Sequence, residues 1–311
     1  MNATAEIRFL PKPQSKQLDT RFDPEHGAYW AMMQPRPRAC FNTHLLSELK
    51  SFIDGIVSSG GRYSHKGDEC TISYAVLASK LDGIFNLGGD LELFRSAIES
   101  GNRTSLERYA KQCIDDLHPW NRNFDLPVTT ISLVQGDALG GGFEAALASS
   151  VLVAEESARM GFPEILFNMF PGMGAYSFLS RKVGRRVTEE LITSGAIYTT
   201  RQLFDMGVVD VIAPDGMGEA AVCGYIRKHA RSANGRRGLE AARREVEPIL
   251  REELDRVVGI WVDAAMKLTP RDLKMMDRLV RAQQRNADVA VAADQGGELN
   301  VVRLEAVGAG D

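Results

Sequence analysis

The sequence predicts an α/β fold, and three observations lead to that prediction. Over the first 170 or so residues, β-rich apolar segments alternate with segments of helical patterning. Two of the β-rich segments are followed by a glycine-rich stretch and then by a helical pattern. Beyond Gly172 the patterning is almost entirely helical. These features predict a core of strands and helices that is followed by a helical C-terminal region.

The composition is that of a folded globular chain. The sequence has 311 residues, 44% hydrophobic and 25% charged, with a formal net charge of -4, which excludes disordered and collagen-like classes. No apolar run reaches the roughly 18 residues of a membrane-spanning helix, so we expect no membrane insertion. Residues 1–16 lack the apolar core of a signal peptide, so we expect a cytoplasmic location. Nucleic-acid binding is not expected at this charge without a recognisable motif.

Reactive side chains other than carboxylates are few. The sequence holds four Cys and five His, with no two Cys closer than 30 positions and no pair at zinc-like spacing. A metal site, a disulfide framework and a resident cofactor are therefore not expected. Ten of the 29 glycines fall within 83–89, 136–142 and 161–174, so these three windows are where we look for chemistry built from backbone amides and carboxylates.

The elements expected in the first part of the chain follow from local patterning. Residues 1–26 are polar and contain Pro11 and Pro13, which predicts an arm or an edge strand. Asn42 or Thr43 can cap an amphipathic helix that runs to about Val57. The β-rich run Thr71–Ser79 is bounded by turn residues and predicts a strand. The other elements expected here are a strand over 27–34, a loop over 58–68, and helices over 90–100 and 103–117.

Later elements are predicted in the same way. A helix over 142–149 is expected between strands over 128–134 and 151–154. Thr269 and Pro270 supply an N-cap and a first-turn proline for a last helix to about Arg285. One apolar helical face is formed by Leu250, Leu254, Val258, Trp261, Ala265 and Leu268. The predicted organisation is an arm (1–26), a core (27–215), a helical region (216–285) and a mobile tail (286–311).

The first glycine-rich window is Phe85–Leu91. Gly88 and Gly89 precede a helical pattern, so their backbone N–H groups can be exposed at a helix N-terminus. Such groups bind anions and stabilise developing oxyanions. The alternative is a plain tight turn in which Asp90 is an acid favoured by the helix dipole.

The second window, Gln135–Glu144, also follows an apolar strand and opens a helix. Gly140, Gly141 and Gly142 let another group approach the backbone closely. The window satisfies the dinucleotide fingerprint G-x-G-x-x-A, but Glu144 would bring a negative charge towards a pyrophosphate. The apolar neighbours of Glu144 instead predict a desolvated carboxylate with a raised pKa, suited to proton transfer. The alternative is an ordinary first-turn acid.

The third window, Met160–Ala175, contains a single carboxylate, Glu164, between Pro163 and Pro171. The alternative is a surface glutamate at a helix start.

Taken together, two backbone-donor turns and two isolated carboxylates predict one reaction class. A thioester carbonyl would lie between two N–H donors, an α-proton would be removed, and the second carboxylate would act at the β-position or on a water.

These windows resemble the crotonase, or enoyl-CoA hydratase/isomerase, superfamily. The family's F-x-x-G-x-D-L pattern is similar to Phe85–Leu91, and its G-x-A-x-G-G-G-x-E pattern to Gly136–Glu144. The P-E and P-G-x-G patterns are similar to residues 163–164 and 171–174, and Thr199–Pro214 resembles a later family segment. The resemblance implies a spiral of ββα units and a C-terminal region that mediates trimerisation. It also implies an oxyanion hole from the N–H groups of Gly89 and Gly141, and catalytic acids at Glu144 and Glu164.

Within this superfamily, residues 27–285 resemble the diffusible-signal-factor synthases most. That resemblance implies dehydration of a 3-hydroxyacyl thioester on acyl carrier protein and hydrolysis of the thioester, which releases a cis-2-unsaturated fatty acid. It also implies acyl carrier protein as a partner and a sensor-kinase receiver domain as a further partner of some members. The alternatives are an enoyl-CoA hydratase/isomerase of fatty-acid metabolism and a non-catalytic crotonase-fold binding protein.

The remaining candidates concern substrate binding. Gly88 and Gly140 border the two donors, and we expect Met173 and Trp261 to line the acyl pocket. We expect Glu144 to take the α-proton. A basic stretch is either a solvated helical surface or a contact for an acidic carrier protein or CoA phosphates; it comprises Arg227, Lys228, Arg231, Arg236, Arg237, Arg243 and Arg244.

Overall fold

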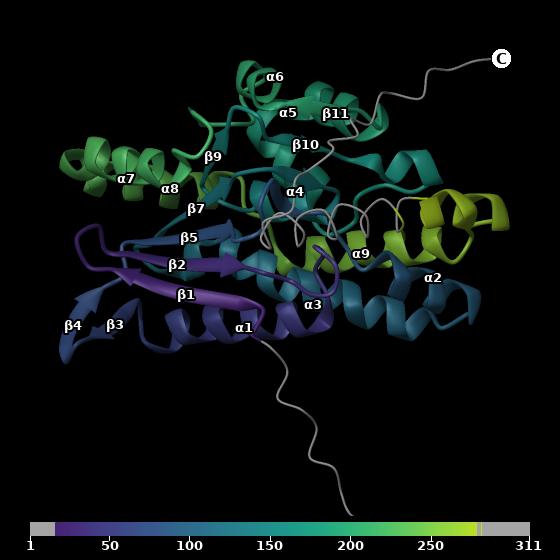
Figure 1. Ribbon diagram of the computed structural model, residues 1–311, viewed down its shortest axis with the longest axis horizontal. Coiled ribbons are helices and arrows are strands. Elements are labelled where there is room, and N and C mark those ends of the chain that lie inside the picture. Colours follow the sequence, from purple (N-terminus) through teal and green to yellow (C-terminus); the bar gives the residue numbers. More distant parts are fainter. Residues whose placement is uncertain (1–15, 279–280, 282–311) are drawn as a thin grey trace, which may run out of the picture.

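The computed structural model describes residues 16–278 and 281, and a six-stranded sheet is its centre (Figure 1). The strand order is β1-β2-β5-β7-β9-β12. The β1–β2 pair is antiparallel, and the other neighbours are parallel. The strands are β1 (Leu18–Asp23), β2 (Ala28–Met33), β5 (Tyr74–Ser79), β7 (Thr129–Val134), β9 (Val151–Glu155) and β12 (Val211–Ala213).

A second sheet of four short strands has the order β11-β10-β8-β6. Its members are β6 (Ile84–Asn86), β8 (Asp137–Leu139), β10 (Arg159–Gly161) and β11 (Ile197–Thr199). The chain passes from β5 to β6, from β7 to β8 and from β9 to β10, and a helix follows each pair. Each turn therefore contributes one strand to each sheet, which confirms the predicted crotonase-like spiral of ββα units.

Helices cover both faces of the large sheet. On one face, α1 (Thr43–Ser58) and α3 (Arg103–Asn121) lie side by side, below the strands in Figure 1. On the other face, α7 (Gly218–His229) packs against β7 and β9. The central strands β5 and β7 are buried along their whole length. This burial explains their continuous apolar runs, since a parallel strand between two helical layers has no solvent face.

Most predicted helices are present with nearly the predicted bounds. Asn42 caps α1, because its side chain accepts hydrogen bonds from His44 N at 3.1 Å and Leu45 N at 3.0 Å. The helix predicted over 90–100 is α2 (Leu91–Glu99), and the one predicted over 142–149 is α4 (Gly141–Leu147).

The structure corrects the prediction at several strands. The expected loop 58–68 contains most of a hairpin formed by β3 (Arg62–His65) and β4 (Asp68–Thr71), and β5 begins only at Tyr74. The hairpin is largely exposed and polar, so the sequence carries no apolar alternation there. Strands β6, β8 and β10 have three residues each, too few to show a period. Of the predicted arm, residues 18–23 form β1 at the edge of the large sheet.

The C-terminal part is mainly helical, as predicted. It contains α5 (Ala175–Thr193), α6 (Thr200–Asp205), α7, α8 (Ala233–Val246), α9 (Arg251–Ala265) and a helix over 270–278. Four members of the predicted apolar face are buried, whereas Leu250 precedes α9 and is 50% exposed. The tail 286–311 lies outside the described residues. Among the residues that are described, no helix is long and apolar enough to span a bilayer.

Candidate active site

All eight predicted site residues line one cavity of about 850 Å³. The cavity begins where the two glycine-rich windows meet and continues between α1 and α3. Most of its other lining side chains are apolar. The structure therefore brings together residues that the sequence places in four separate segments: Gly88, Gly89, Gly140, Gly141, Glu144, Glu164, Met173 and Trp261.

The two predicted N–H donors, Gly89 and Gly141, lie close together. A Cβ built on Gly141, the first residue of α4, would lie 3.3 Å from the backbone N of Gly89. Neither N–H has a hydrogen-bond partner among residues 16–278. Asn86 Oδ1 accepts from Gly88 N at 2.8 Å, and Phe41 N donates to Gly88 O at 2.8 Å. The loop is therefore held by its other polar groups, while Gly89 and Gly141, whose N–H groups are unpaired, line the cavity.

Gly140 brings the second window close to the Glu164 carboxylate. Its φ of +52° favours glycine, and a Cβ at this position would overlap Oε1 of Glu164. Its backbone N donates to Gly161 O at 2.9 Å, which ties the turn to β10. A larger residue at 140 would displace the carboxylate.

Glu144 is buried in the first turn of α4. Its Oε1 accepts from the backbone N of Met173 at 2.8 Å and of Ala175 at 3.0 Å. Burial raises the pKa of Glu144 to about 7, although these two hydrogen bonds act in the opposite direction. The side chain can therefore accept or release a proton near neutral pH.

Glu164 lies at the start of the short 3₁₀ helix η2 (Pro163–Phe167). Its Oε2 is buried without a hydrogen-bond partner among the described residues. Burial, followed by the charge of Glu144, raises the pKa of Glu164 to about 8. Because a cavity lined by apolar side chains disfavours two neighbouring charges, the two acids form a pair that favours sharing one proton at neutral pH.

The predicted acyl-pocket residues, Met173 and Trp261, come from two different elements and line the same cavity. Met173 belongs to the loop before α5, and Trp261 projects from α9. The Trp261 ring packs directly on Gly172, where no Cβ would fit, and meets the Phe94 ring edge-on at 5.1 Å between centroids. Met173 is 7% exposed and Trp261 is 4% exposed. Both line the cavity, so their assignment to the acyl pocket agrees with their position.

Sequence reasoning missed two cavity residues on α3. The hydroxyl of Tyr109 accepts from Asp90 N at 3.2 Å and donates to Phe41 O, which anchors the Gly88–Gly89 loop. Asp116 is a buried carboxylate further along the same helix face. The spacing of Tyr109, Cys113, Asp116 and Trp120 along one helical face was a usable signal.

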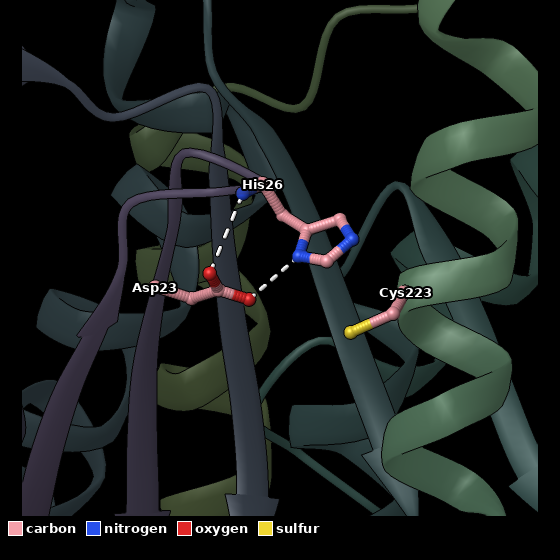
Figure 2. Close-up of side chains that lie close together, drawn as sticks. All are labelled: Asp23, His26 and Cys223. Carbon is pink, nitrogen blue, oxygen red and sulfur yellow. Dashed lines mark hydrogen bonds and ion pairs between the residues drawn. The ribbon is translucent and has the colours of Figure 1, made fainter.

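A cluster of potential metal ligands lies elsewhere, where the β1–β2 turn meets α7 (Figure 2). Ligand atoms of Asp23, His26 and Cys223 lie within 4.8 Å of one another. No spacing rule could foresee this, because Cys223 is remote in sequence. His26 Nδ1 lies 2.7 Å from Asp23 Oδ2, and its Nε2 lies 3.2 Å from Arg227 Nη1.

The hydrogen bonds of this cluster fit a neutral histidine. Arg227 can only donate, so Nε2 of His26 accepts and Nδ1 carries the proton that Asp23 accepts. A metal on Nδ1 would move that proton to Nε2, against the Arg227 donor. This is the reverse of the arrangement around metal-bound histidines, whose second nitrogen donates to an acceptor.

The predicted basic stretch is helical and lies mainly on α7 and α8. Four of its residues are exposed, and Arg236, Arg237 and Arg244 are half-buried. Several of its residues border a second cavity of about 850 Å³ that shares no lining residue with the first. Among the residues described, Lys228, Arg243 and Arg244 in its lining form no ion pair. This surface is suited to an acidic partner.

Comparison with known proteins identifies one protein family that matches this chain. Residues 64–255 match the family model described as enoyl-CoA hydratase/isomerase. An enoyl-CoA isomerase/hydratase of Zymoseptoria tritici is 25% identical over 225 residues, which are 71% of this chain and 66% of that protein. A fatty acid oxidation complex subunit alpha of Idiomarina loihiensis is 28% identical over 240 residues, 74% of this chain and 32% of that protein. The chain thus spans less than two thirds of either relative.

The fold is found in solved structures as well. An enoyl-CoA hydratase from Bacillus halodurans superposes with a TM-score of 0.71 at 18% identity, covering 85% of this chain and 100% of that one. A human mitochondrial Δ3-Δ2-enoyl-CoA isomerase gives a TM-score of 0.70 at 16% identity, covering 87% and 99%. At these identities the likeness concerns the fold.

Proposed function

Because the chain belongs to the enoyl-CoA hydratase/isomerase family, we propose that it hydrates or isomerises an enoyl thioester, such as an enoyl-CoA, through an enolate. One observation carries this proposal. Two carboxylates with raised pKa values lie beside two unpaired backbone N–H groups in a single apolar cavity. No other arrangement of the described residues combines a proton donor, a proton acceptor and an oxyanion site.

In this mechanism the thioester oxygen accepts hydrogen bonds from Gly89 N and Gly141 N. In the dehydration direction, Glu144 takes the α-proton, and the electron pair moves onto the thioester oxygen as an enolate. The enolate collapses, the C3–O bond breaks, and protonated Glu164 gives its proton to the leaving hydroxyl, which departs as water. Hydration is the reverse. Glu144 suits the charged state because two N–H groups donate to its Oε1. Glu164 suits the protonated state because its Oε2 is buried without a partner among the described residues, and because burial and the charge of Glu144 raise its pKa further, to about 8.

A second candidate is the synthesis of a cis-2-unsaturated fatty acid signal from a 3-hydroxyacyl group on acyl carrier protein. The motif resemblance over residues 27–285 favours it, and the unpaired cations on α7 and α8 suit an acidic carrier protein. It needs one further step, in which a water activated by Glu164 attacks the thioester carbonyl and the carrier thiol leaves. A homotrimer and contact with a sensor-kinase receiver domain belong to the same proposal.

One pair of incubations separates these functions. The purified protein is mixed with trans-2-decenoyl-CoA in one arm and with 3-hydroxydodecanoyl-carrier protein in the other, and products are identified by mass spectrometry. Reversible formation of 3-hydroxydecanoyl-CoA, or of a double-bond isomer, supports the hydratase/isomerase. Free cis-2-dodecenoic acid in the second arm supports the signal synthase.

The controls test whether the chemistry belongs to this cavity. Glu144→Gln and Glu164→Gln are expected to lower turnover by roughly 10²–10⁴-fold. Glu156→Gln changes an exposed glutamate outside the cavity and is expected to have no effect. The enzymatic proposal fails if neither substrate reacts, or if turnover is unchanged in both Glu144→Gln and Glu164→Gln. Either result would favour the alternative of a non-catalytic binding protein.

A further inference from the structure

Asp116 is a buried carboxyl group for which the proposed reaction has no use. It lies on α3, is 6% exposed and lines the active-site cavity. Both of its carboxyl oxygens are buried without a hydrogen-bond partner among the described residues. An unpartnered buried polar group is costly and rare in folded proteins. A partner that enters the cavity would remove this cost.

The position of Asp116 relates it to the acyl chain. One face of α3 lines the cavity with Tyr109, Cys113, Asp116, Leu117 and Trp120. Tyr109 marks the thioester end, since its hydroxyl contacts the Gly88–Gly89 loop. Asp116 lies seven residues further on, about 10 Å along the helix axis. In an extended acyl chain, each C–C bond of roughly 1.5 Å advances about 1.25 Å along the chain axis, so about eight bonds cover this span.

The surroundings of Asp116 keep it neutral. Nearby cavity wall from α1 is apolar and consists of Leu46, Leu49 and Ile53. The charged groups that act on Asp116 are Asp115, Lys50 and Asp54. Lys50 pairs with Asp54, and Asp115 pairs with Arg251 at 2.5 Å, so none of them binds Asp116 directly. Burial raises its pKa to about 8, and the protonated acid offers both a donor and an acceptor.

We propose that Asp116 forms a polar subsite in the acyl cavity, which selects acyl chains carrying a hydroxyl group about eight carbons from the thioester carbonyl. The inference rests on the proposed function in one respect, namely that the cavity holds an acyl thioester. A hydroxyl group matches a neutral carboxylic acid, because each can donate to the other and accept from it. A cationic group fits less well, since it would need Asp116 ionised within an apolar wall.

Binding of two unreactive thioesters tests the subsite. Decanoyl-CoA and 10-hydroxydecanoyl-CoA lack both a 2,3-double bond and a 3-hydroxyl, so neither can be hydrated, dehydrated or isomerised. Mass spectrometry checks that both thioesters stay intact, and calorimetry then reports their dissociation constants. The quantity compared is the preference, defined as the Kd of decanoyl-CoA divided by that of 10-hydroxydecanoyl-CoA. Asp116→Leu should lower this preference about tenfold, the effect of losing one buried hydrogen bond. Asp116→Asn keeps a donor and an acceptor and should preserve most of it.

Asp115→Asn is the matched control, because it removes the adjacent charge without changing the cavity lining; its preference should equal that of the wild type. An equal preference in the wild type and Asp116→Leu would overturn the subsite, and it would mean that water alone satisfies Asp116. If both thioesters bind, the acyl-thioester premise holds whatever the preference. If neither binds, that premise and the subsite fall together.

Discussion

The backbone N–H of Met173 donates to Oε1 of Glu144 at 2.8 Å, although the two residues lie 29 positions apart. Ala175, the first residue of α5, donates to the same oxygen at 3.0 Å. The carboxylate thus lies at the N-terminus of α5, where helix N–H groups favour negative charge. One oxygen of Glu144 is fixed by the loop that also lines the acyl pocket, so the position of the base and the shape of the pocket depend on each other.

This relationship predicts how Glu144→Gln and Glu144→Ala differ. Glutamine can still accept both hydrogen bonds through its carbonyl oxygen, so the free energy of unfolding should not fall, while turnover drops roughly 10²–10⁴-fold. Glu144→Ala leaves two buried N–H groups unpaired, so it should lower the free energy of unfolding by about 1–3 kcal/mol as well as lowering turnover. Urea denaturation and steady-state turnover measure the two effects. Equal stability of both variants would contradict the role of these hydrogen bonds.

The coupled acids predict a bell-shaped dependence of kcat/KM on pH. Activity requires one ionised and one protonated carboxyl group, and burial raises the pKa values to about 7 for Glu144 and about 8 for Glu164. The rate should therefore rise as the first proton leaves, reach its maximum near pH 7–8, and fall as the second leaves. Initial rates from pH 5 to 10 measure this. A profile without a falling limb would exclude a protonated partner.

Gly140→Ala should damage catalysis more than stability. Its Cβ would overlap the Glu164 carboxylate and would also be strained at a φ of +52°. A displacement of about 1 Å is enough to cost roughly 100-fold in rate. Gly238→Ala is the matched control, because Gly238 is exposed within α8 and its Cβ would meet no atom. That variant should retain full activity and gain about 0.5–1 kcal/mol of stability.

The sequence was sufficient to select residues that line one common cavity. Glycine-rich stretches before helices, with one acid in each of two apolar windows, leave a local trace in composition. The glycine-rich windows, Glu144 and Glu164 could therefore be chosen without knowing how the windows meet, whereas the choice of Gly89 and Gly141 as donors followed from the family resemblance. The close approach of Gly140 to Glu164 was not predictable, since it depends on how β8 and β10 pair.

Features that depend on tertiary contacts alone have no comparable signal in the local sequence. The hairpin over residues 62–71 is polar and exposed, and the three-residue strands of the small sheet are stabilised by their neighbours rather than by their own patterning. The cluster of Asp23, His26 and Cys223 exists only because α7 packs beside the β1–β2 turn. Spacing rules apply to residues that are close in sequence, and Cys223 is remote in sequence from Asp23 and His26.

Trp261 is predicted to limit the acyl chain. Its ring packs on Gly172 and against the Phe94 edge in the cavity wall. Trp261→Ala should open the wall and shift the preferred substrates and released products towards longer chains, at a cost of about 3–5 kcal/mol in stability. Because such a loss can unfold the protein, Trp261→Phe is the milder companion and should give a smaller shift in the same direction. An unchanged chain-length profile in both variants would exclude Trp261 from the acyl pocket.

Asp116 also predicts a pH-dependent stability difference that needs no ligand. Its pKa is about 8 in the folded protein, raised by burial from an ordinary 3.8. Between these values the folded state keeps a proton that the unfolded state has released, so the free energy of unfolding falls as pH rises. Asp116→Asn removes this titration, so the stability of the variant relative to the wild type should rise progressively from pH 5 to pH 8, by roughly 3–4 kcal/mol over that range.

Urea denaturation at pH 5, 6, 7 and 8 measures this difference, and the contributions of Glu144 and Glu164 cancel because both proteins contain them. Asp115→Asn is the comparison, since Asp115 is ion-paired with Arg251 and is less buried than Asp116. Because the charge of Asp115 contributes to the raised pKa of Asp116, this variant should show a stability difference that grows with pH much less than that of Asp116→Asn. If the free energy of unfolding depends on pH in the same way in the wild type and in Asp116→Asn, Asp116 is ionised in the folded state and has a partner inside the cavity.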